Sequence, residues 1–169
     1  MEYIAAPWRD AYIRNASKET GCVFCRAARA KDDAAALVLD RGRGAFVLMN
    51  KFPYLPGHLL IAPYRHTARF ERASAEMTAE MTALLHRSLR VLRAHYRPQG
   101  FNTGMNLGRA AGAGVVDHFH LHIVPRWTGD SNFMPVIGRT KVVLEDLDAT
   151  FARLAPLFRK DRKLHPPTP

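Results

Sequence analysis

The sequence predicts an α+β fold, with an antiparallel sheet packed against one long helix and several shorter helices. Apolar segments of strand length precede residues 75–97, which carry the clearest helical pattern, and further apolar strands follow them. Strands grouped before and after a helix are typical of α+β domains, whereas α/β proteins alternate strand and helix regularly. With 169 residues, of which 47% are hydrophobic, the chain is long enough for one domain with a complete core.

The first half of the chain is expected to supply an arm, a short helix and three strands. Residues 1–20 have a mixed composition and predict an irregular N-terminal arm, which Trp8 and Tyr12 anchor by burying their rings. A short helix is expected at about residues 23–31. Apolar runs bounded by Arg-Gly-Arg-Gly and by a Pro-Gly turn predict strands at residues 37–40, 45–49 and 58–62, the first two forming a hairpin.

The second half begins with the long helix. Apolar residues at three- and four-residue spacing predict it over residues 75–97, where Ser74 can cap its start and Pro98 ends it. Strands are expected at residues 101–106 and 118–125, joined by a Gly- and Ala-rich loop, and a final helix at about residues 145–159. A single domain therefore spans residues 21–159, and residues 160–169 are expected to form a disordered tail.

Residues 118–126 read His-Phe-His-Leu-His-Ile-Val-Pro-Arg and are the most informative stretch of the chain. Side chains of a β-strand point alternately to opposite faces, so His118, His120 and His122 share one face and face outward, while the apolar residues between them share the other. Such a row of imidazoles can provide a nucleophile, a phosphate donor or a metal ligand. A surface strand with incidental histidines is the alternative, but the complete two-residue periodicity favours an active site.

The pattern His-φ-His-φ-His-φ-φ, with φ apolar, resembles the signature of the histidine-triad (HIT) family of nucleotide hydrolases and nucleotidyl transferases. Asn50, the segment Pro56 to His66, Asn106-Leu-Gly and Ala111-Gly-Ala-Gly114 resemble further elements of that family in the same order. Residues 125–138 resemble the branch that contains diadenosine tetraphosphate phosphorylases. The resemblance covers about residues 20–145 and implies a HIT-like fold that pairs as a homodimer, or as a dimer of dimers.

The resemblance also implies an activity, the cleavage of dinucleoside polyphosphates such as diadenosine tetraphosphate, or of related adenosine nucleotides, through a covalent nucleotidyl-histidine. It assigns His120 as the nucleophile and places His122 beside the phosphate oxygens, to which it would donate, with His118 completing the triad. His58 could orient His120 or merely satisfy a turn. Water as acceptor gives hydrolysis and inorganic phosphate gives phosphorolysis. Phosphorylases of this branch carry Gly-Gly-Ser where this chain has Gly112-Ala113-Gly114, which makes hydrolysis at least as strong an expectation.

Other residues are candidates for substrate binding. The N–H groups of Gly112, Ala113 and Gly114 could face phosphate, although an ordinary flexible loop has the same composition. Asn50 and Asn106 end strands, and the resemblance supports ribose and phosphate contacts for their amides, with turn capping as the alternative. Apolar residues at strand and helix positions could form the walls around the base, although most such residues belong to a core. These wall candidates are Val23, Phe24, Phe46, Leu48 and Phe52.

The two cysteines, Cys22 and Cys25, have the Cys-x-x-Cys spacing of metal and redox sites. The order of elements does not offer the βαβ setting of thioredoxin-like redox motifs, and zinc would need two further ligands, for which histidine is the natural supply. Relatives implied by the resemblance, including the galactose-1-phosphate uridylyltransferases, hold zinc with the residues equivalent to these cysteines, His66 and His118. Four protein ligands predict a structural zinc ion, and free buried cysteines are the alternative.

The net charge of +10 predicts an anionic partner, and polyphosphate nucleotides satisfy it without nucleic acid. Two readings compete with a dinucleotide-cleaving enzyme: a nucleoside phosphoramidate hydrolase with the same triad, and an adenosine-nucleotide sensor without turnover. A zinc-bearing RNA-binding module is a third, motivated by the charge alone. No apolar run approaches the ~20 residues that span a bilayer, and the N-terminal residues lack a signal-peptide pattern, so we expect a cytoplasmic location without a membrane partner.

Overall fold

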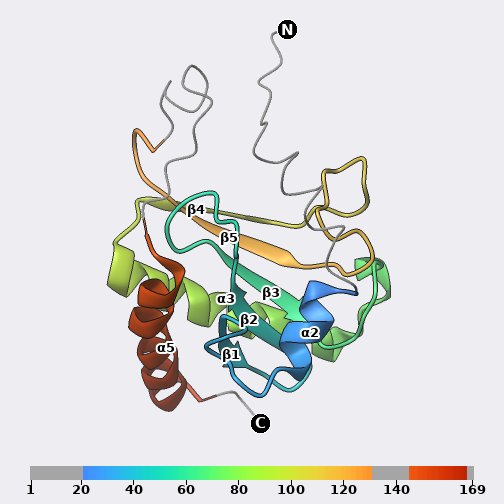
Figure 1. Cartoon of the computed structure of the whole chain (residues 1–169), viewed down its shortest axis with the longest axis horizontal. Helices are drawn as coiled ribbons and strands as arrows, with labels where there is room; N and C mark the ends of the chain where they lie inside the picture. Colours follow the sequence, from blue (N-terminus) through green and yellow to red (C-terminus); the bar gives the residue numbers. More distant parts are fainter. Residues whose placement is uncertain (1–20, 131–144, 167–169) are drawn as a thin grey trace, which may run out of the picture.

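The computed structural model describes residues 21–130 and 145–166. They form an α+β domain (Figure 1), which confirms the predicted fold class. The expected arm at residues 1–20, with Trp8 and Tyr12, lies outside the described residues. The elements, in chain order, are α2 (Val23–Arg29), β1 (Val38–Arg41), β2 (Ala45–Met49), β3 (Leu59–Pro63), the 3-10 turn η1 (Phe70–Arg72), α3 (Ala75–Tyr96), β4 (Gly100–Gly104), β5 (Leu121–Arg126) and α5 (Leu147–Leu164).

The five strands form one antiparallel sheet with the order β1-β2-β3-β5-β4. Its register places Leu48 opposite Leu60 and Leu60 opposite His122, so these three side chains point to the same face. On β4, Gly104 stands opposite His122. The last histidine of the triad is therefore fixed on one face of the sheet by backbone pairing alone.

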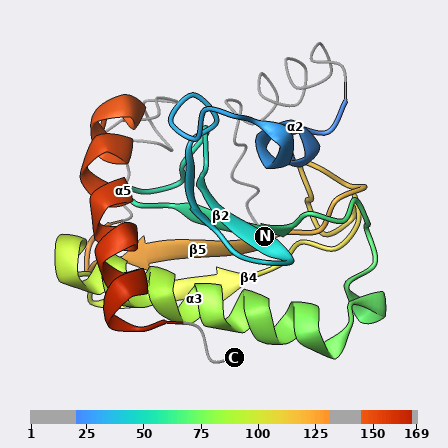
Figure 2. The ribbon, with the colours of Figure 1, turned by 90° about the horizontal axis from the view of Figure 1, so that it is seen from below.

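The sheet separates two apolar clusters. Strand residues that alternate with Leu48 and Leu60 pack with α3 and α5, and Figure 2 shows these helices beneath and beside the sheet. The opposite face carries Phe24 and Ala27 of α2 against Phe46, Leu48 and Leu60. Because β2 and β3 are buried throughout, both faces exclude water, and α2 is held directly over the face that bears His122.

The long helix agrees with its predicted bounds to within one residue. Ser74 caps α3, since its side chain accepts a hydrogen bond from the Met77 N–H, and Arg97 ends it in a left-handed conformation at φ 48°. The face buried against the sheet includes Met81, Leu84 and Leu92. The periodic apolar residues thus form the face that the sequence pattern predicts.

The final helix is longer than predicted. The expectation of a disordered tail from residue 160 is wrong for residues 160–164, because α5 continues to Leu164. Its last turns are held by ion pairs: Arg162 binds the buried Asp40 of β1, and Asp161 binds Arg87 and Arg90 of α3. Residues that looked like a solvated charge run therefore attach α5 to the sheet and to α3.

No helix in the described ranges, 21–130 and 145–166, is long and apolar enough to cross a membrane.

Candidate functional site

The histidine triad spans the entry into β5. The expectation of a strand from residue 118 is wrong by three residues, because β5 begins at Leu121 and the backbone N–H of Phe119 donates to the carbonyl of Thr67 instead. The alternation of faces still holds. Phe119 is buried against Phe70 in the cluster beneath the sheet, while the His120 and His122 rings lie 4.8 Å apart on the other side.

The triad does not face outward as predicted, since His118 and His120 are only 0% and 4% exposed. Helix α2 covers them, and the ring of Phe24 lies 4.6 Å from that of His120 and 5.2 Å from that of His118. Burial disfavours a charged imidazole, and it lowers the pKa of both His118 and His120 below the usual value. Both rings are therefore neutral at physiological pH, as a nucleophile and a metal ligand need to be.

The hydrogen bonds of His118 direct one ring nitrogen toward the cysteines. Its Nε2–H donates to the carbonyl of Pro63 over 2.8 Å, so in the neutral ring Nδ1 carries the lone pair. That Nδ1 lies 3.3 Å from the Sγ of Cys22 and 3.8 Å from the Sγ of Cys25. A metal-binding histidine typically holds its other N–H in this way.

Together with His66, whose Nδ1 lies 3.4 Å from the Sγ of Cys25, these residues form a four-membered cluster. All four ligand atoms lie within 4.8 Å of one another. In a tetrahedral zinc site, bond lengths of about 2.3 Å to sulfur and 2.05 Å to nitrogen give S···N edges of about 3.6 Å. The three S···N distances, 3.3, 3.4 and 3.8 Å, bracket that value, so the four residues are close to the arrangement that a tetrahedral metal ion needs. The structure thus brings together the four residues that the family resemblance implies.

The backbone of His118 also sets the state of His120. The Nδ1–H of His120 donates to the His118 carbonyl over 3.0 Å, because a carbonyl can only accept. In the neutral ring the lone pair then lies on Nε2, and His120 lines a large cavity between α2 and the sheet. This is the arrangement that a nucleophilic histidine requires.

His58 orients a different histidine from the one expected. It is 2% exposed, and its Nδ1 accepts the backbone N–H of Tyr54 over 3.1 Å and faces the amide of Asn50 at 3.2 Å. Its Nε2–H therefore donates to Nδ1 of His122 over 3.0 Å, which places the proton of neutral His122 on Nε2. The prediction that His58 orients His120 is wrong, since the His118 carbonyl has that role and His58 serves His122.

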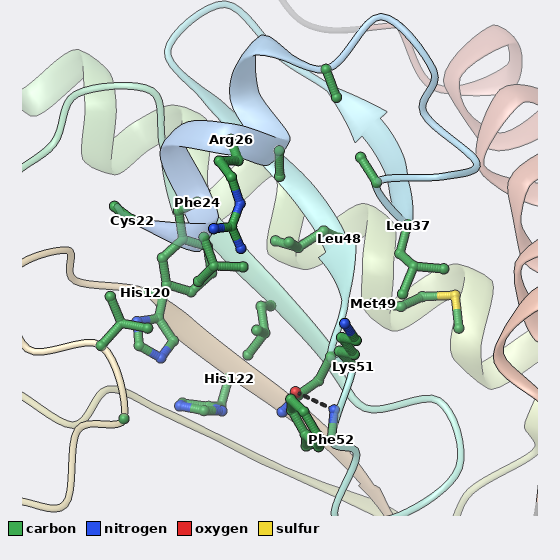
Figure 3. Close-up of a pocket in the computed structure, with 18 of the residues that line it drawn as sticks. Cys22, Phe24, Arg26, Leu37, Leu48, Met49, Lys51, Phe52, His120 and His122 are labelled. Carbon is green, nitrogen blue, oxygen red and sulfur yellow. Dashed lines mark hydrogen bonds between the residues drawn. The ribbon is translucent and has the colours of Figure 1, made fainter. Parts of the chain in front are cut away.

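A cavity of about 1390 Å³ extends from the triad between α2 and the sheet (Figure 3). Most of the wall candidates line it, but Phe46 does not, because it is 0% exposed and stacks on Tyr64 within the core. Figure 3 shows Arg26 reaching from α2 toward the same space, with Lys51 on its far side. The catalytic and substrate-binding candidates that line the cavity are Val23, Phe24, Leu48, Asn50, Phe52, Asn106, Gly112, Gly114, His120 and His122. Two of the metal-ligand candidates, Cys22 and His66, line it as well.

Arg26, Lys51 and Tyr54 line the cavity and were missed in the sequence. For Arg26 a signal was present, because Val23 and Arg26 are three residues apart on a helix and so share a face. Lys51 and Tyr54 follow β2 in a segment whose path no periodicity predicts.

The loop before the triad offers fewer free backbone N–H groups to a phosphate than expected. The N–H of Gly112 donates to the carbonyl of Arg109, and that of Ala113 to the carbonyl of Gly108, so both groups close the turn and do not face phosphate. Ala113 is also absent from the cavity lining. The prediction of three N–H donors is therefore wrong for Gly112 and Ala113, and Gly114 alone keeps that candidate role.

Comparisons with known proteins identify the family of the chain. Residues 31–129 match the HIT domain, and the chain belongs to the HIT domain family. It is 42% identical over 123 residues to AP-4-A phosphorylase from Mycobacterium tuberculosis, a match that covers 73% of this chain and 63% of that protein. An uncharacterised HIT-like protein from Saccharolobus solfataricus is 29% identical, over 67% of this chain and 79% of its own.

Among solved structures, a zinc-bound histidine triad family protein from Mycobacterium smegmatis superposes with a TM-score of 0.68 at 25% identity, covering 86% of this chain and 98% of that one. Diadenosine triphosphate hydrolase from Plasmodium falciparum shares the fold, with a TM-score of 0.62 at 18% identity over 78% and 79% of the two chains.

Proposed function

We propose that this protein transfers a nucleotidyl group from a dinucleoside polyphosphate, such as diadenosine tetraphosphate, through a covalent intermediate on His120. The observation that carries the proposal is the hydrogen bond from Nδ1–H of His120 to the His118 carbonyl, which leaves the lone pair of Nε2 at the large cavity. The 42% identity to a protein named AP-4-A phosphorylase supports the substrate class.

In the first step, Nε2 of His120 attacks the α-phosphorus, and the bond from phosphorus to the bridging oxygen breaks. That oxygen keeps the electron pair and leaves as part of a nucleoside polyphosphate. His122 holds its proton on Nε2, so it can donate to a non-bridging oxygen as negative charge accumulates in the transition state. Tyr54 and Asn50 hold His58, and His58 holds His122 in this state.

In the second step, an acceptor oxygen attacks the nucleotidyl-histidine, the P–N bond breaks, and its electron pair returns to Nε2 of His120. The acceptor loses its proton to solvent. Water yields a nucleoside monophosphate and inorganic phosphate yields a nucleoside diphosphate. Two N–H groups of the Gly-Ala-Gly loop are used within the turn, and the loop has no hydroxyl, which supports water as the acceptor.

Cys22, Cys25, His66 and His118 would hold a structural zinc ion. Bound there, zinc would cross-link α2, the segment after β3 and the start of the triad, with no open position for substrate. The zinc-bound relative from M. smegmatis supports this assignment. A homodimer and a cytoplasmic location remain predictions from the sequence.

Intact-protein mass spectrometry tests the proposal. The wild-type protein, mixed briefly with diadenosine tetraphosphate and denatured, should carry one adenylyl group, and His120→Ala should carry none and lose turnover by about 10³-fold or more. His86→Ala, a change of an exposed histidine on α3, is the matched control and should behave as wild type. An adduct on His120→Ala would remove His120 as the nucleophile.

The acceptor is tested by product analysis in the presence and absence of inorganic phosphate. AMP and ATP without added phosphate indicate hydrolysis, whereas ADP and ATP formed only with phosphate would establish phosphorolysis. If no AMP, ADP or ATP is released and AMP binds reversibly, the nucleotide-sensor interpretation is favoured. Turnover of adenosine phosphoramidate alone would favour the phosphoramidate hydrolase.

A further inference from the structure

The last residue of α3, Tyr96, is tied to a part of the chain that lies beyond the matched HIT domain, which ends at residue 129. The hydroxyl of Tyr96 donates to Oε2 of Glu145 over 2.7 Å. Glu145 also accepts from Thr150 and Arg153 of α5, over 3.0 and 2.9 Å. Figure 1 shows this end of α3 beside the first turns of α5. The start of α5 therefore fixes the hydroxyl end of the Tyr96 ring.

This hydrogen bond persists over the whole neutral pH range. Burial, together with the hydrogen bond to Glu145, raises the pKa of the Tyr96 hydroxyl well above its usual value, so the group keeps its proton and remains a donor. A bond from a hydroxyl to a carboxylate belongs to the stronger, charge-assisted class. The orientation of the ring is thus set by a durable contact with the C-terminal helix.

The ring of Tyr96 also borders the turn that precedes a histidine of the site. Gly57 is buried, has a φ of +72°, and a Cβ built on it would lie 2.9 Å from Cε2 of Tyr96 and 3.1 Å from Cδ2 of Leu92. Real Cβ atoms do not approach other atoms so closely, so the backbone of Gly57 already lies against both side chains. Packed atoms transmit displacement, and a shift of the Tyr96 ring would therefore move this turn.

His58 follows Gly57 directly and determines the state of His122. The carbonyl of His58 accepts the N–H of Asn50 over 3.0 Å, and its Nε2–H donates to Nδ1 of His122 over 3.0 Å. If the turn moves, this N···N distance lengthens and Nδ1 of His122 loses its donor. Nothing in that bond would then keep the proton of His122 on Nε2.

We propose that Tyr96 is a positioning residue for His58 and, through it, for the proton of His122; this rests on the function proposed above. The Gly57 turn transmits the position of the ring, and Glu145 anchors the ring to α5. The C-terminal helix thereby contributes to catalysis without contacting substrate through these residues, since neither Tyr96 nor Glu145 lines the cavity that contains His120.

Four single variants separate this role from simple stabilisation. Tyr96→Phe keeps the ring and removes the donor, and Glu145→Ala removes the acceptor. Glu145→Gln is the conservative variant, because its amide oxygen can still accept from the hydroxyl. Asp161→Asn is the matched control, since Asp161 joins α5 to Arg90 of α3 near the other end of α5.

The kinetic readout is the separation of kcat from KM with diadenosine tetraphosphate. A catalytic group misplaced by about 1 Å can cost about 100-fold in rate, so a smaller displacement of His122 should lower kcat by about fivefold to tenfold in Tyr96→Phe and in Glu145→Ala. KM should stay within about twofold, because substrate contacts are unchanged. The double variant should be no slower than either single variant, as expected of two residues that act through one bond. Glu145→Gln and Asp161→Asn should keep kcat within about twofold of wild type.

A second readout is independent of activity. In protein labelled with ¹⁵N-histidine, NMR distinguishes a protonated ring nitrogen from one that carries a lone pair. Wild type and Asp161→Asn should show His122 protonated on Nε2, whereas Tyr96→Phe should shift its two nitrogen signals toward a mixture of the two tautomers.

A Tyr96→Phe protein with a lower Tm but unchanged kcat and unchanged His122 signals would overturn the proposal and leave Tyr96 a purely structural role. An equal loss of kcat in Asp161→Asn would also overturn it, because the rate would then follow stability. If the wild-type protein transfers no adenylyl group, the proposed function fails, while the NMR comparison still decides whether Tyr96 controls the proton of His122.

Discussion

Removing a metal ion from the Cys22, Cys25, His66 and His118 cluster should destabilise the whole domain. The four ligands come from three segments that are distant in sequence, and Cys22 and His118 are 96 residues apart. A metal ion that bridges these segments restricts the unfolded chain as a covalent cross-link does, provided that the ion is bound in both the folded and the unfolded state. The magnitude can therefore be estimated from the length of the closed loop.

For a loop of 96 residues the chain-entropy relation gives about 4.7 kcal/mol at 25 °C. For a domain of this size each kcal/mol changes Tm by about 2–4 °C, so loss of the cross-link lowers Tm by about 9–19 °C. This estimate already counts the metal as bound to the unfolded chain, whose cysteines and histidines remain available as ligands. A decrease of about this size is thus the expected result.

The assay combines metal analysis of the purified protein with thermal unfolding before and after treatment with a chelator. We expect about one zinc ion per chain, a lower Tm after chelation, and recovery of Tm when zinc is restored. Cys22→Ala should lack both the metal and the response to chelator, while His86→Ala, outside the cluster, should retain both. Wild-type protein that contains no metal and keeps its Tm in the presence of chelator would refute the reasoning and leave a cluster of free thiols and imidazoles.

Three further changes test the packing around the site. Asp40→Ala should cost up to about 3–5 kcal/mol in urea unfolding, because it removes the carboxylate that lies 2.7 Å from the buried guanidinium of Arg87 and leaves that charge only the more distant Asp161, at 3.5 Å; a cost below about 1 kcal/mol would contradict this. Gly57→Ala should cost about 2 kcal/mol or more by the same method, since φ is +72° and the new Cβ would lie 2.9 Å from the Tyr96 ring, and an unchanged midpoint would show that the turn relaxes. The hydrogen bond from Arg90 holds the pKa of Asp161 below its usual value, so the stability that Asp161 contributes is present above about pH 4 and is lost as the pH falls through the lower folded-state pKa. The difference in unfolding free energy between wild type and Asp161→Asn should accordingly narrow from pH 7 to about pH 3. A difference that stays constant would rule out the ion pairs of Asp161 as its source.

The sequence predicted the elements of the fold because their periodicities are strong, and it failed where tertiary contacts decide. The alternating residues around His120 and the apolar face of α3 are local patterns. The start of β5 depends on Phe119, whose N–H pairs with Thr67 from another loop. The length of α5 depends on Arg162, which binds Asp40 at a separation of 122 residues. Neither partner can be identified from local composition.

In the candidate site, too, sequence motifs predicted some residues, whereas tertiary structure decided the role of others. Family motifs grouped the two cysteines with His66 and His118, and the structure brings all four together. Composition could not separate Phe46, a core residue, from Phe52, which lines the cavity and is 45% exposed, because both are phenylalanines beside or within β2.

The three histidines at two-residue intervals differ in which ring nitrogen faces which neighbour, because each ring has a different hydrogen-bond partner. The Pro63 carbonyl takes the Nε2 proton of His118, which turns Nδ1 toward the thiols; the His118 carbonyl takes the Nδ1 proton of His120, which frees the lone pair of Nε2 for attack; and His58 donates to Nδ1 of His122, which keeps the proton of His122 on Nε2. Two of these bonds involve His118, once through its ring and once through its backbone. A metal ion bound at the Nδ1 of His118 would therefore also fix the carbonyl that orients His120, so metal binding and the orientation of the proposed nucleophile are joined through a single residue.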